Sequence, residues 1–214
     1  VATVSKACRP TGMRRHILDT ALGLFARDGF FNTSIHDIQR EAGVSIGSIY
    51  NHFGGKEGVA KALYDMLLGQ MDEVVNEVTA SRSGAYERGR GVVQRLFELA
   101  EQMPETMRFI LGAKHREFLP DEPPICSAKP FVRLRDIVNE GIASGELRRM
   151  DPWVAASCVF GPALRMITLR LDGVLPGDLT NYTTEVWDAA WRAVQGSPAV
   201  AAPVTSSVLS LATT

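Results

Sequence analysis

Apolar residues recur every three or four positions along most of the 214-residue chain, and this period is typical of amphipathic helices. The first part of the chain is predicted to form three such helices, over residues 13–27, 34–42 and 46–53. Gly29 follows the first segment and Gly43 the second, and glycine favours the left-handed conformation that ends a helix. Ser34, with Asp37 three residues later, has the pattern of a capping box, and Ser45 is a second N-cap candidate.

The helical period continues beyond residue 55, where we expect six further helices. Their predicted ranges are 56 to beyond 78, 86–102, 104–118, 131–144, 153–171 and 181–194. Pro162 is expected to kink the fifth of these. The four prolines within 120–130 predict a loop, and no run of alternating strand residues is present. The predicted fold class is therefore all-α, with a three-helix head, a helical body and about nine helices in total.

These patterns divide the chain into four parts. Residues 1–13 are polar, with a proline and a glycine, and are predicted to form a flexible arm. Residues 14–55 make the head and residues 56–195 the body. From 196 to 214 small residues and proline follow one another without period, which predicts a disordered tail.

The distribution of charge along the chain says more about function than the net charge of −1 does. Up to Lys61 the chain carries eight Lys and Arg against five Asp and Glu, and the remainder carries 15 against 19. A mildly basic head on an acidic body fits a protein whose contact with DNA is confined to one end.

Cysteines and apolar segments argue against several classes of protein. Cys8, Cys126 and Cys158 have no CxxC spacing, so neither a disulfide framework nor a zinc site is predicted. Apolar stretches such as 110–113 are short and interrupted by charge, and no signal segment is seen, so we expect a soluble, cytoplasmic protein that does not contact a membrane. Cys126 has no close charged neighbour in the sequence, and an unreactive thiol is expected there.

Motifs of catalysis are missing from the sequence. It contains no GxSxG, no paired histidines at helical spacing and no clustered acid pair. Gly54-Gly55-Lys56 lacks the upstream strand and the glycine spacing of a phosphate-binding loop. We therefore expect no enzyme activity, no catalytic or metal site and no cofactor.

The second and third predicted helices, joined by a three-residue turn with Gly43, have the layout of a helix-turn-helix. Ile49 and Phe53 are expected to face inward. The positions left outside carry no acid; they are Ser45, Ile46, Gly47, Ser48, Tyr50, Asn51 and His52. Short hydroxyls, an amide and an aromatic hydroxyl suit close approach to DNA, whereas the alternative is that they only solvate a helical hairpin.

Residues 14–63 resemble the head of the tetracycline-repressor (TetR) family in order and spacing. The matching stretches are Ile17-Leu18-Asp19, Ala21, Leu24 to Phe30, Thr33-Ser34, Asp37-Ile38, Ala42 to Phe53 and Lys56-Glu57. The body resembles the family only in layout, with Gly145-Glu146-Leu147 before Asp151-Pro152 and two terminal apolar helices. Two positions depart from the family: Ile46 stands where lysine is frequent, and Gln39 where alanine is usual.

The resemblance implies a DNA-binding transcriptional repressor and assigns roles to individual residues. Tyr50 and Lys56 are expected to bind phosphates, with further phosphate contacts from Thr33 or Ser34 and from Ser45. Ile46 and Gly47 would approach thymine methyl groups, while Ser48, Asn51 and His52 would reach base edges. Arg14 and Arg15 are expected to reach a neighbouring groove.

A single head reads only a few base pairs, so we expect a homodimer on double-stranded operator DNA. The last two helices are the predicted interface, as the resemblance also implies; its residues are Trp153, Phe160, Leu164, Ile167, Leu171, Val186, Trp187 and Ala190. The same residues would also pack in the core of one chain, and we expect them to serve both roles.

Methionines and aromatic residues are frequent in the middle helices, where they would form either ordinary core or an adaptable pocket. The candidate pocket residues are Met66, Met103, Met107, Ile110, His115, Phe118, Phe131 and Phe160. His115 alone is expected to be a packing or surface residue more than a ligand. An unidentified apolar or amphipathic effector bound there would shift the head spacing away from the operator. The competing hypothesis is a helical adaptor that binds a protein partner instead of DNA.

Overall fold

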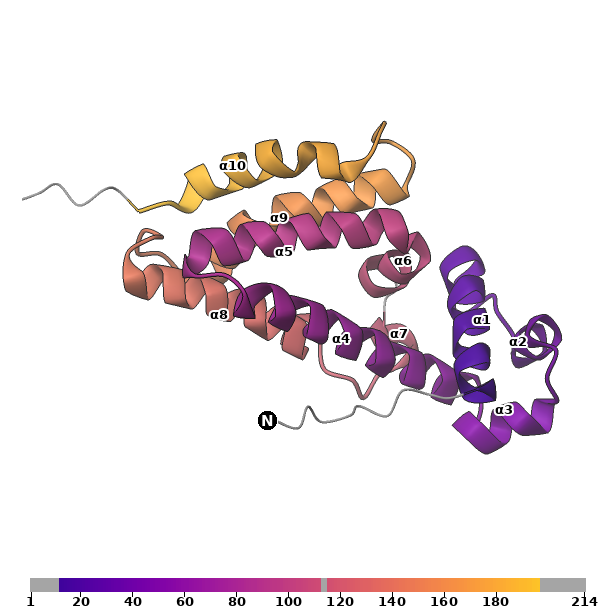
Figure 1. Cartoon of the computed structure of the whole chain (residues 1–214). Coiled ribbons are helices and arrows are strands. Elements are labelled where there is room, and N and C mark those ends of the chain that lie inside the picture. The colour runs from indigo at the N-terminus through magenta and orange to yellow at the C-terminus, as the bar shows by residue number, and fades with distance from the viewer. Residues whose placement is uncertain (1–11, 113–114, 197–214) are drawn as a thin grey trace, which may run out of the picture.

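The structure is a computed structural model that describes residues 12–112 and 115–196 (Figure 1). Over these ranges the chain forms ten α-helices and two short 3-10 helices, and the predicted all-α fold is confirmed. One helix more than expected is found because the segment predicted as 104–118 forms two separate helices. Most of the predicted arm and tail lies outside the described residues.

Three helices form the head at one end of an elongated molecule (Figure 1): α1 (Met13–Asp28), α2 (Ile35–Ala42) and α3 (Ile46–Phe53). The predicted caps are present. Ser34 accepts a hydrogen bond from the backbone N–H of Asp37, and the Asp37 carboxylate accepts one from the backbone N–H of Ser34. The bonds from Ser34 lower the pKa of Asp37 to about 2, so the cap stays charged. Gly43 ends α2 with φ 63°, as its position predicted.

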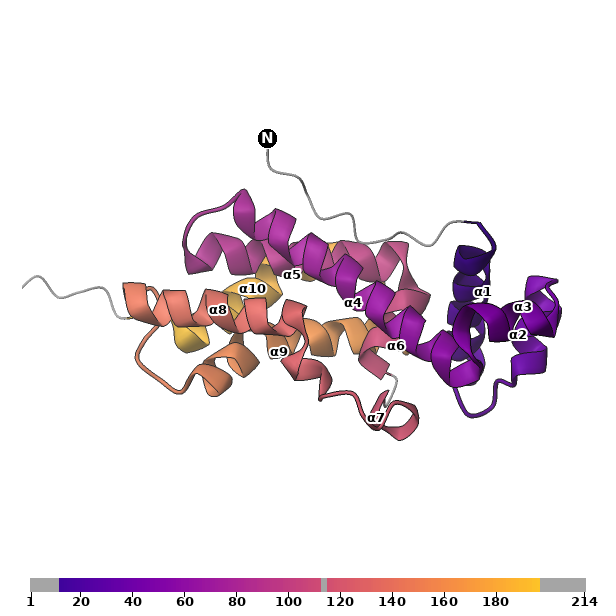
Figure 2. The same ribbon diagram turned by 90° about the horizontal axis from the view of Figure 1, so that it is seen from below.

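Helix α4 (Lys56–Ala80) leaves the head and runs along the body in both views (Figures 1 and 2). Its first turns bury Val59, Ala60 and Leu63, and its later turns bury Met71 and Val75. The first group packs next to α1 and α3, whereas the second belongs to the core of the body. One continuous helix therefore contributes to both parts of the molecule.

Six further helices complete the body. They are α5 (Gly84–Gln102), α6 (Pro104–Gly112), α7 (His115–Phe118), α8 (Lys129–Ser144), α9 (Pro152–Leu171) and α10 (Thr183–Val194), with 3-10 helices η1 (Ile125–Ser127) and η2 (Leu179–Tyr182). The predicted loop 120–130 is thus shorter than expected. Helix α8 starts before Pro130 because proline in a first helical turn gives up no hydrogen bond.

Two ion pairs attach α4 to the segment that contains α7 and α8. Lys61 lies 3.1 Å from Glu122, which follows α7, and Arg133 of α8 lies 2.5 Å from Asp72. Both pairs are partly exposed, so each contributes little stability alone, but together they fix where this segment sits along α4.

Helix α9 corrects the expectation that every apolar stretch is too short to span a membrane. It continues through Pro162 for 20 residues and is long and apolar enough, by length and composition, to cross one. Its inner side packs on α5, α8 and α10, with Ala155, Phe160 and Ile167 buried. Only 28% of its apolar stretch is buried within the chain, so much of the helix presents an uncovered apolar surface.

Candidate nucleic-acid interface

Helix α3 presents the side chains that the sequence pattern places outside. Ile49 is fully buried and Phe53 is half-buried, so these two anchor the helix to the head. Tyr50 is 54% exposed, and Ser45, Gly47, Asn51 and His52 are exposed with it. Ile46 and Ser48 are half-buried. The outer surface of α3 is therefore polar and free of acidic side chains.

The start of α3 has two features that bear on its role. Ser45 caps the helix, since its Oγ accepts the backbone N–H of Ser48 at 3.1 Å. The hydroxyl of Ser48 donates to Sδ of Met13 at 2.9 Å, which connects α3 to the first residue of α1. The backbone N–H groups of a first helical turn favour an anion, so this end of α3 suits a phosphate.

Two arginines at the start of α1 lie in different settings. The Arg14 guanidinium lies 5.0 Å from the centre of the Phe53 ring, and no carboxylate partner is found for it among the described residues. Arg15 pairs with Asp19 at 2.7 Å, one helical turn along. Arg14 is therefore the more available positive charge next to α3.

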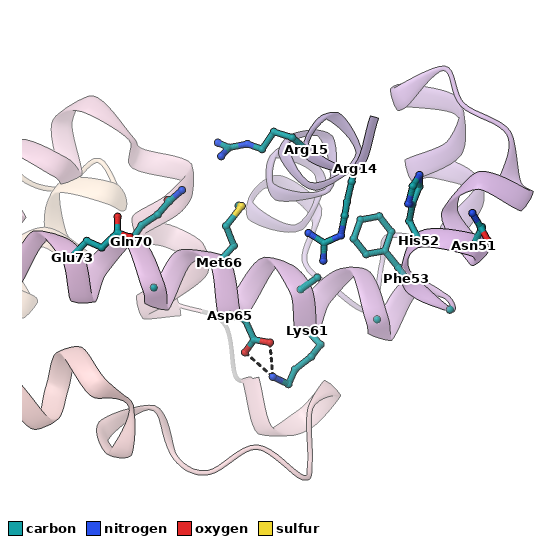
Figure 3. A pocket seen from close by; sticks show the side chains of 14 residues that line it. Arg14, Arg15, Asn51, His52, Phe53, Lys61, Asp65, Met66, Gln70 and Glu73 are labelled. Carbon is teal, nitrogen blue, oxygen red and sulfur yellow. Dashed lines mark hydrogen bonds and ion pairs between the residues drawn. The ribbon is translucent and has the colours of Figure 1, made fainter. Parts of the chain in front are cut away.

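An open groove of about 710 Å³ lies between the start of α1, the end of α3 and the first half of α4 (Figure 3). Arg14, His52 and Lys61 are among its lining residues. The Lys61 ammonium is bound to Asp65 at 2.6 Å, as the dashed lines show (Figure 3). Met66, which was expected in a pocket of the body, lines this groove instead.

The hydroxyls before α2 are used inside the head. Thr33 is 2% exposed and its Oγ1 donates to the carbonyl of Gly29 at 2.9 Å. Ser34 Oγ donates to the Asp37 carboxylate at 2.6 Å in addition to its capping bond. Both side chains thus hold the turn between α1 and α2.

Lys56 opens α4 and is half-buried. Its ammonium donates to the backbone carbonyls of Phe30 at 2.9 Å and Thr33 at 3.0 Å. It also lies 4.0 Å from the centre of the Phe30 ring. The side chain is therefore directed into the head.

A cluster of aromatic rings joins the head to the body. Phe30 stacks on Phe118 of α7 at 4.3 Å, and Phe25 stacks on Phe109 of α6 at 6.1 Å. These four rings line a cleft of about 490 Å³ between α1, α6, α7 and α9. Phe118 therefore belongs to the junction between head and body and not to the interior of the body.

His115 is buried between α4, α6 and α7. It is 6% exposed and lies against the rings of Tyr64, Phe109 and Phe118. Its Nε2 is 3.2 Å from the carbonyl of Ile110, while Nδ1 is buried and has no hydrogen-bond partner among residues 12–112 and 115–196. Burial lowers the pKa of the ring, so His115 is neutral near pH 7.

Two small, partly open cavities lie in the body, of about 20 and 30 Å³. Met107 and Ile110 line both, Met103 lines one and Phe131 the other, which brings together four of the predicted pocket residues. Phe160 is buried on α9 outside both cavities. The sequence reasoning missed Val75, although its helical spacing from Met71 on the inner side of α4 is the signal that would have found it.

The eight predicted interface residues fall into two groups. Buried within the single chain are Phe160, Ile167, Trp187 and Ala190, which therefore belong to its own core. Trp153 is 55% exposed, and Leu164, Leu171 and Val186 are half-buried. The uncovered surface of α9 also includes Val154, at 52% exposure, and Cys158.

Comparison with known proteins gives two family matches that together cover most of the chain. Residues 17–63 match the bacterial regulatory proteins of the tetR family, and residues 64–196 match the tetracyclin repressor-like C-terminal domain. The fatty acid metabolism regulator protein of Bacillus subtilis (strain 168) is 27% identical over 168 residues, which are 76% of this chain and 84% of that protein. The HTH-type transcriptional repressor KstR2 of Mycolicibacterium smegmatis is 28% identical over 153 residues, 65% of this chain and 70% of that protein.

The fold is also that of a solved regulator. The crystal structure of the transcriptional regulator FadR from Bacillus subtilis in complex with stearoyl-CoA superposes with a TM-score of 0.70 at 24% identity, over 82% of this chain and 96% of that one. The helix-turn-helix of α2 and α3 lies within the residues that match the tetR regulatory proteins. Most of the helical body lies within the residues that match the C-terminal domain. The chain belongs to the TetR family, and it is a DNA-binding transcriptional repressor and not an enzyme.

Proposed function

We propose that this repressor binds a palindromic operator as a homodimer, with one α3 helix in the major groove of each half-site. The outward surface of α3 supports this proposal most strongly, because the seven exposed or half-buried positions within 45–48 and 50–52 carry no acid. A repressor of this kind acts in the cytoplasm, where its operator lies.

Direct contacts with DNA are assigned to exposed groups of the head. Tyr50 and the N-terminal turn of α3, with Ser45, would bind phosphates, and Arg14 and Arg15 would follow the backbone into the neighbouring groove. Asn51 and His52 are the exposed side chains suited to base edges, with Ser48 beside them. Ile46 and Gly47 have small or apolar surfaces suited to thymine methyl groups.

The homodimer proposal rests on the uncovered apolar surface of α9. Large exposed apolar patches on a monomer mark interaction sites, and in this protein two heads must be held at a fixed spacing. Trp153, Val154 and Leu164 would meet a second copy of α9 and α10, while Phe160 and Trp187 support that surface from the core. A second copy would cover the apolar stretch that also has the length of a membrane span.

The proposed effector is an acyl-CoA thioester, an amphipathic molecule with a long apolar chain. Support comes from the solved Bacillus subtilis regulator, which carries stearoyl-CoA, and from the apolar cavities around Met107 and Ile110. These cavities are far smaller than an acyl chain, so binding would require α4, α6 and α8 to move apart. Methionine side chains adapt to such a change because they are flexible.

Selection from a library of random DNA duplexes tests the operator proposal. We expect the native protein to enrich a palindrome, and Tyr50→Phe with Asn51→Ala to lose it. Val174→Ala is the matched control, because Val174 is 66% exposed in the loop between α9 and η2, in a part of the chain separate from the head. No enrichment by the native protein at low salt would contradict the proposal and favour the helical adaptor.

Release of the selected operator tests the effector proposal. Stearoyl-CoA is expected to weaken operator binding, while free CoA is expected to have no effect. Stearate and a steroid distinguish the thioester from other apolar ligands. Release by the steroid alone, or by none of the four, would contradict an acyl-CoA effector and leave the DNA-binding proposal intact.

A further inference from the structure

Lys56 has a local environment that differs from that of a phosphate-binding lysine. An ammonium group has three N–H donors. Two of them are used within the chain by the carbonyls of Phe30 and Thr33, at 2.9 and 3.0 Å. The Phe30 ring, 4.0 Å from Nζ, occupies a further side of the group. Little of the ammonium is left for a phosphate oxygen.

The Phe30 ring is shared by the head and the body. Lys56 contacts it from the start of α4, and Phe118 of α7 stacks on it at 4.3 Å with the planes 17° apart. Phe118 in turn lies against Phe109 and His115, and His115 is hydrogen-bonded to the carbonyl of Ile110. Ile110 lines both body cavities. A continuous set of contacts therefore leads from the cavities to Lys56.

The two carbonyls bound by Lys56 belong to the turn that sets the position of α2. Phe30 follows the end of α1, and Thr33 directly precedes Ser34, the N-cap of α2. Thr33 is itself buried, so a change in its position would move the start of α2. Lys56 thus fixes the helix-turn-helix relative to α4 by holding this turn.

We infer that Lys56 is a positioning residue for operator binding and not a phosphate contact, and that the Phe30 ring is the point through which α7 holds the head. This role rests on operator binding by α3, and its regulatory part rests on an effector in the body cavities. An effector that displaces Ile110 and α7 would disturb the Phe118–Phe30 stack and release the turn that Lys56 holds.

Substitutions of Lys56 separate the two roles, because arginine binds phosphate at least as well as lysine does. Its planar, larger guanidinium does not fit between two carbonyls and a ring in the manner of an ammonium. We expect Lys56→Arg and Lys56→Met both to weaken operator binding about tenfold, as the loss of charged hydrogen bonds predicts. The slope of log affinity against log salt should stay close to that of the native protein.

A phosphate contact predicts a different outcome. Lys56→Met would then lower the salt slope by about 0.9, the value for one neutralised phosphate, and Lys56→Arg would bind like the native protein. That result would overturn the inference. Absence of any operator for the native protein would instead contradict the proposed function before this question arises.

Phe118→Leu tests the link to the body, because Phe118 lies outside the head. Phe97→Leu is the matched control: Phe97 is fully buried in α5 and has no ring contact with Phe30 among the described residues. Both substitutions are expected to lower the melting temperature. Only Phe118→Leu is expected to weaken operator binding, by about fivefold, the loss typical of an aromatic pair, with an unchanged salt slope.

Combining Phe118→Leu with Lys56→Met completes the test. If both act through Phe30, the double variant should bind more tightly than the product of the two single effects predicts. Equal operator affinities for Phe118→Leu and Phe97→Leu, or multiplicative effects in the double variant, would overturn the link between α7 and Lys56.

Discussion

Arg170, near the end of α9, donates two hydrogen bonds to the carboxylate of Glu101, near the end of α5, at 2.8 and 3.0 Å. The same carboxylate accepts the backbone N–H of Leu179 in η2 at 2.9 Å. Hydrogen bonding from Arg170 is the main cause of the lowered pKa of Glu101. One charged side chain therefore connects three elements of the body.

Glu101→Gln removes this charge and keeps the shape of the side chain. We expect the free energy of unfolding near neutral pH to fall by about 1 kcal/mol, since the pair is partly exposed and solvent screens it. The folded pKa lies below the unfolded value of about 4.3, so the contribution is present above that pH and is lost as the pH falls through the folded pKa. Urea unfolding at neutral and acidic pH measures it. An equal difference at both would contradict the assignment.

His115 is expected to make the free energy of unfolding depend on pH in a second, higher pH range. Burial lowers its pKa in the folded protein, whereas the unfolded chain takes up a proton below about pH 6.5. Stability should therefore decrease as the pH falls from about 6.5 toward the folded pKa. In His115→Phe this decrease should be smaller. His36→Gln is the control, because His36 is exposed in α2, and its unfolding should follow the native protein.

Gly161 offers a test of the proposed dimer that spares the fold of one chain. It lies within α9, and a Cβ added there meets no atom within 4 Å. Gly161→Glu would place a charge on the apolar surface proposed to meet the second copy, and we expect sedimentation to show a monomer. Gly69→Glu is the matched control, since Gly69 is an exposed helical glycine in α4 with equal space around it. A dimer in both variants would place the interface elsewhere.

Met107 lines both body cavities and is 1% exposed. Met107→Ala would join and enlarge these spaces, so we expect the free energy of unfolding to fall by about 2–5 kcal/mol. An acyl-CoA bound there should recover part of this loss. Met103→Ala, at a residue that is 42% exposed, should cost much less. Calorimetry with and without stearoyl-CoA measures both, and equal losses in the two variants would contradict a buried role for Met107.

Local signals in the sequence predicted the head closely. Caps and glycines act within three or four residues, so Ser34, Gly43 and Ser45 defined the ends of α2 and α3 without tertiary information. The outward surface of α3 followed from the helical period alone.

Contacts between distant segments were harder to infer. Phe118 and Met66 were both expected in one pocket, but they lie in two different clefts because helix crossing angles decide which apolar side chains meet. Lys56 was expected to bind a phosphate, whereas its ammonium donates to carbonyls of the turn after α1, a contact between segments that local patterns do not reveal. The apolar positions of a helix also do not show whether they pack within the same chain or against a second copy. Phe160 is buried within the chain, whereas Trp153 on the same helix is exposed.

The single helix α4 has a mechanical consequence. Lys56 at its start is held by the head, and Met71, fifteen positions further along, lines the body cavities. At a rise of 1.5 Å per residue, roughly 22 Å of continuous helix separates the two residues. A tilt of about 5° at Met71 would therefore displace the head by about 2 Å. In the proposed homodimer both heads would shift in this way, and the spacing of the two α3 helices would no longer match one turn of a DNA duplex.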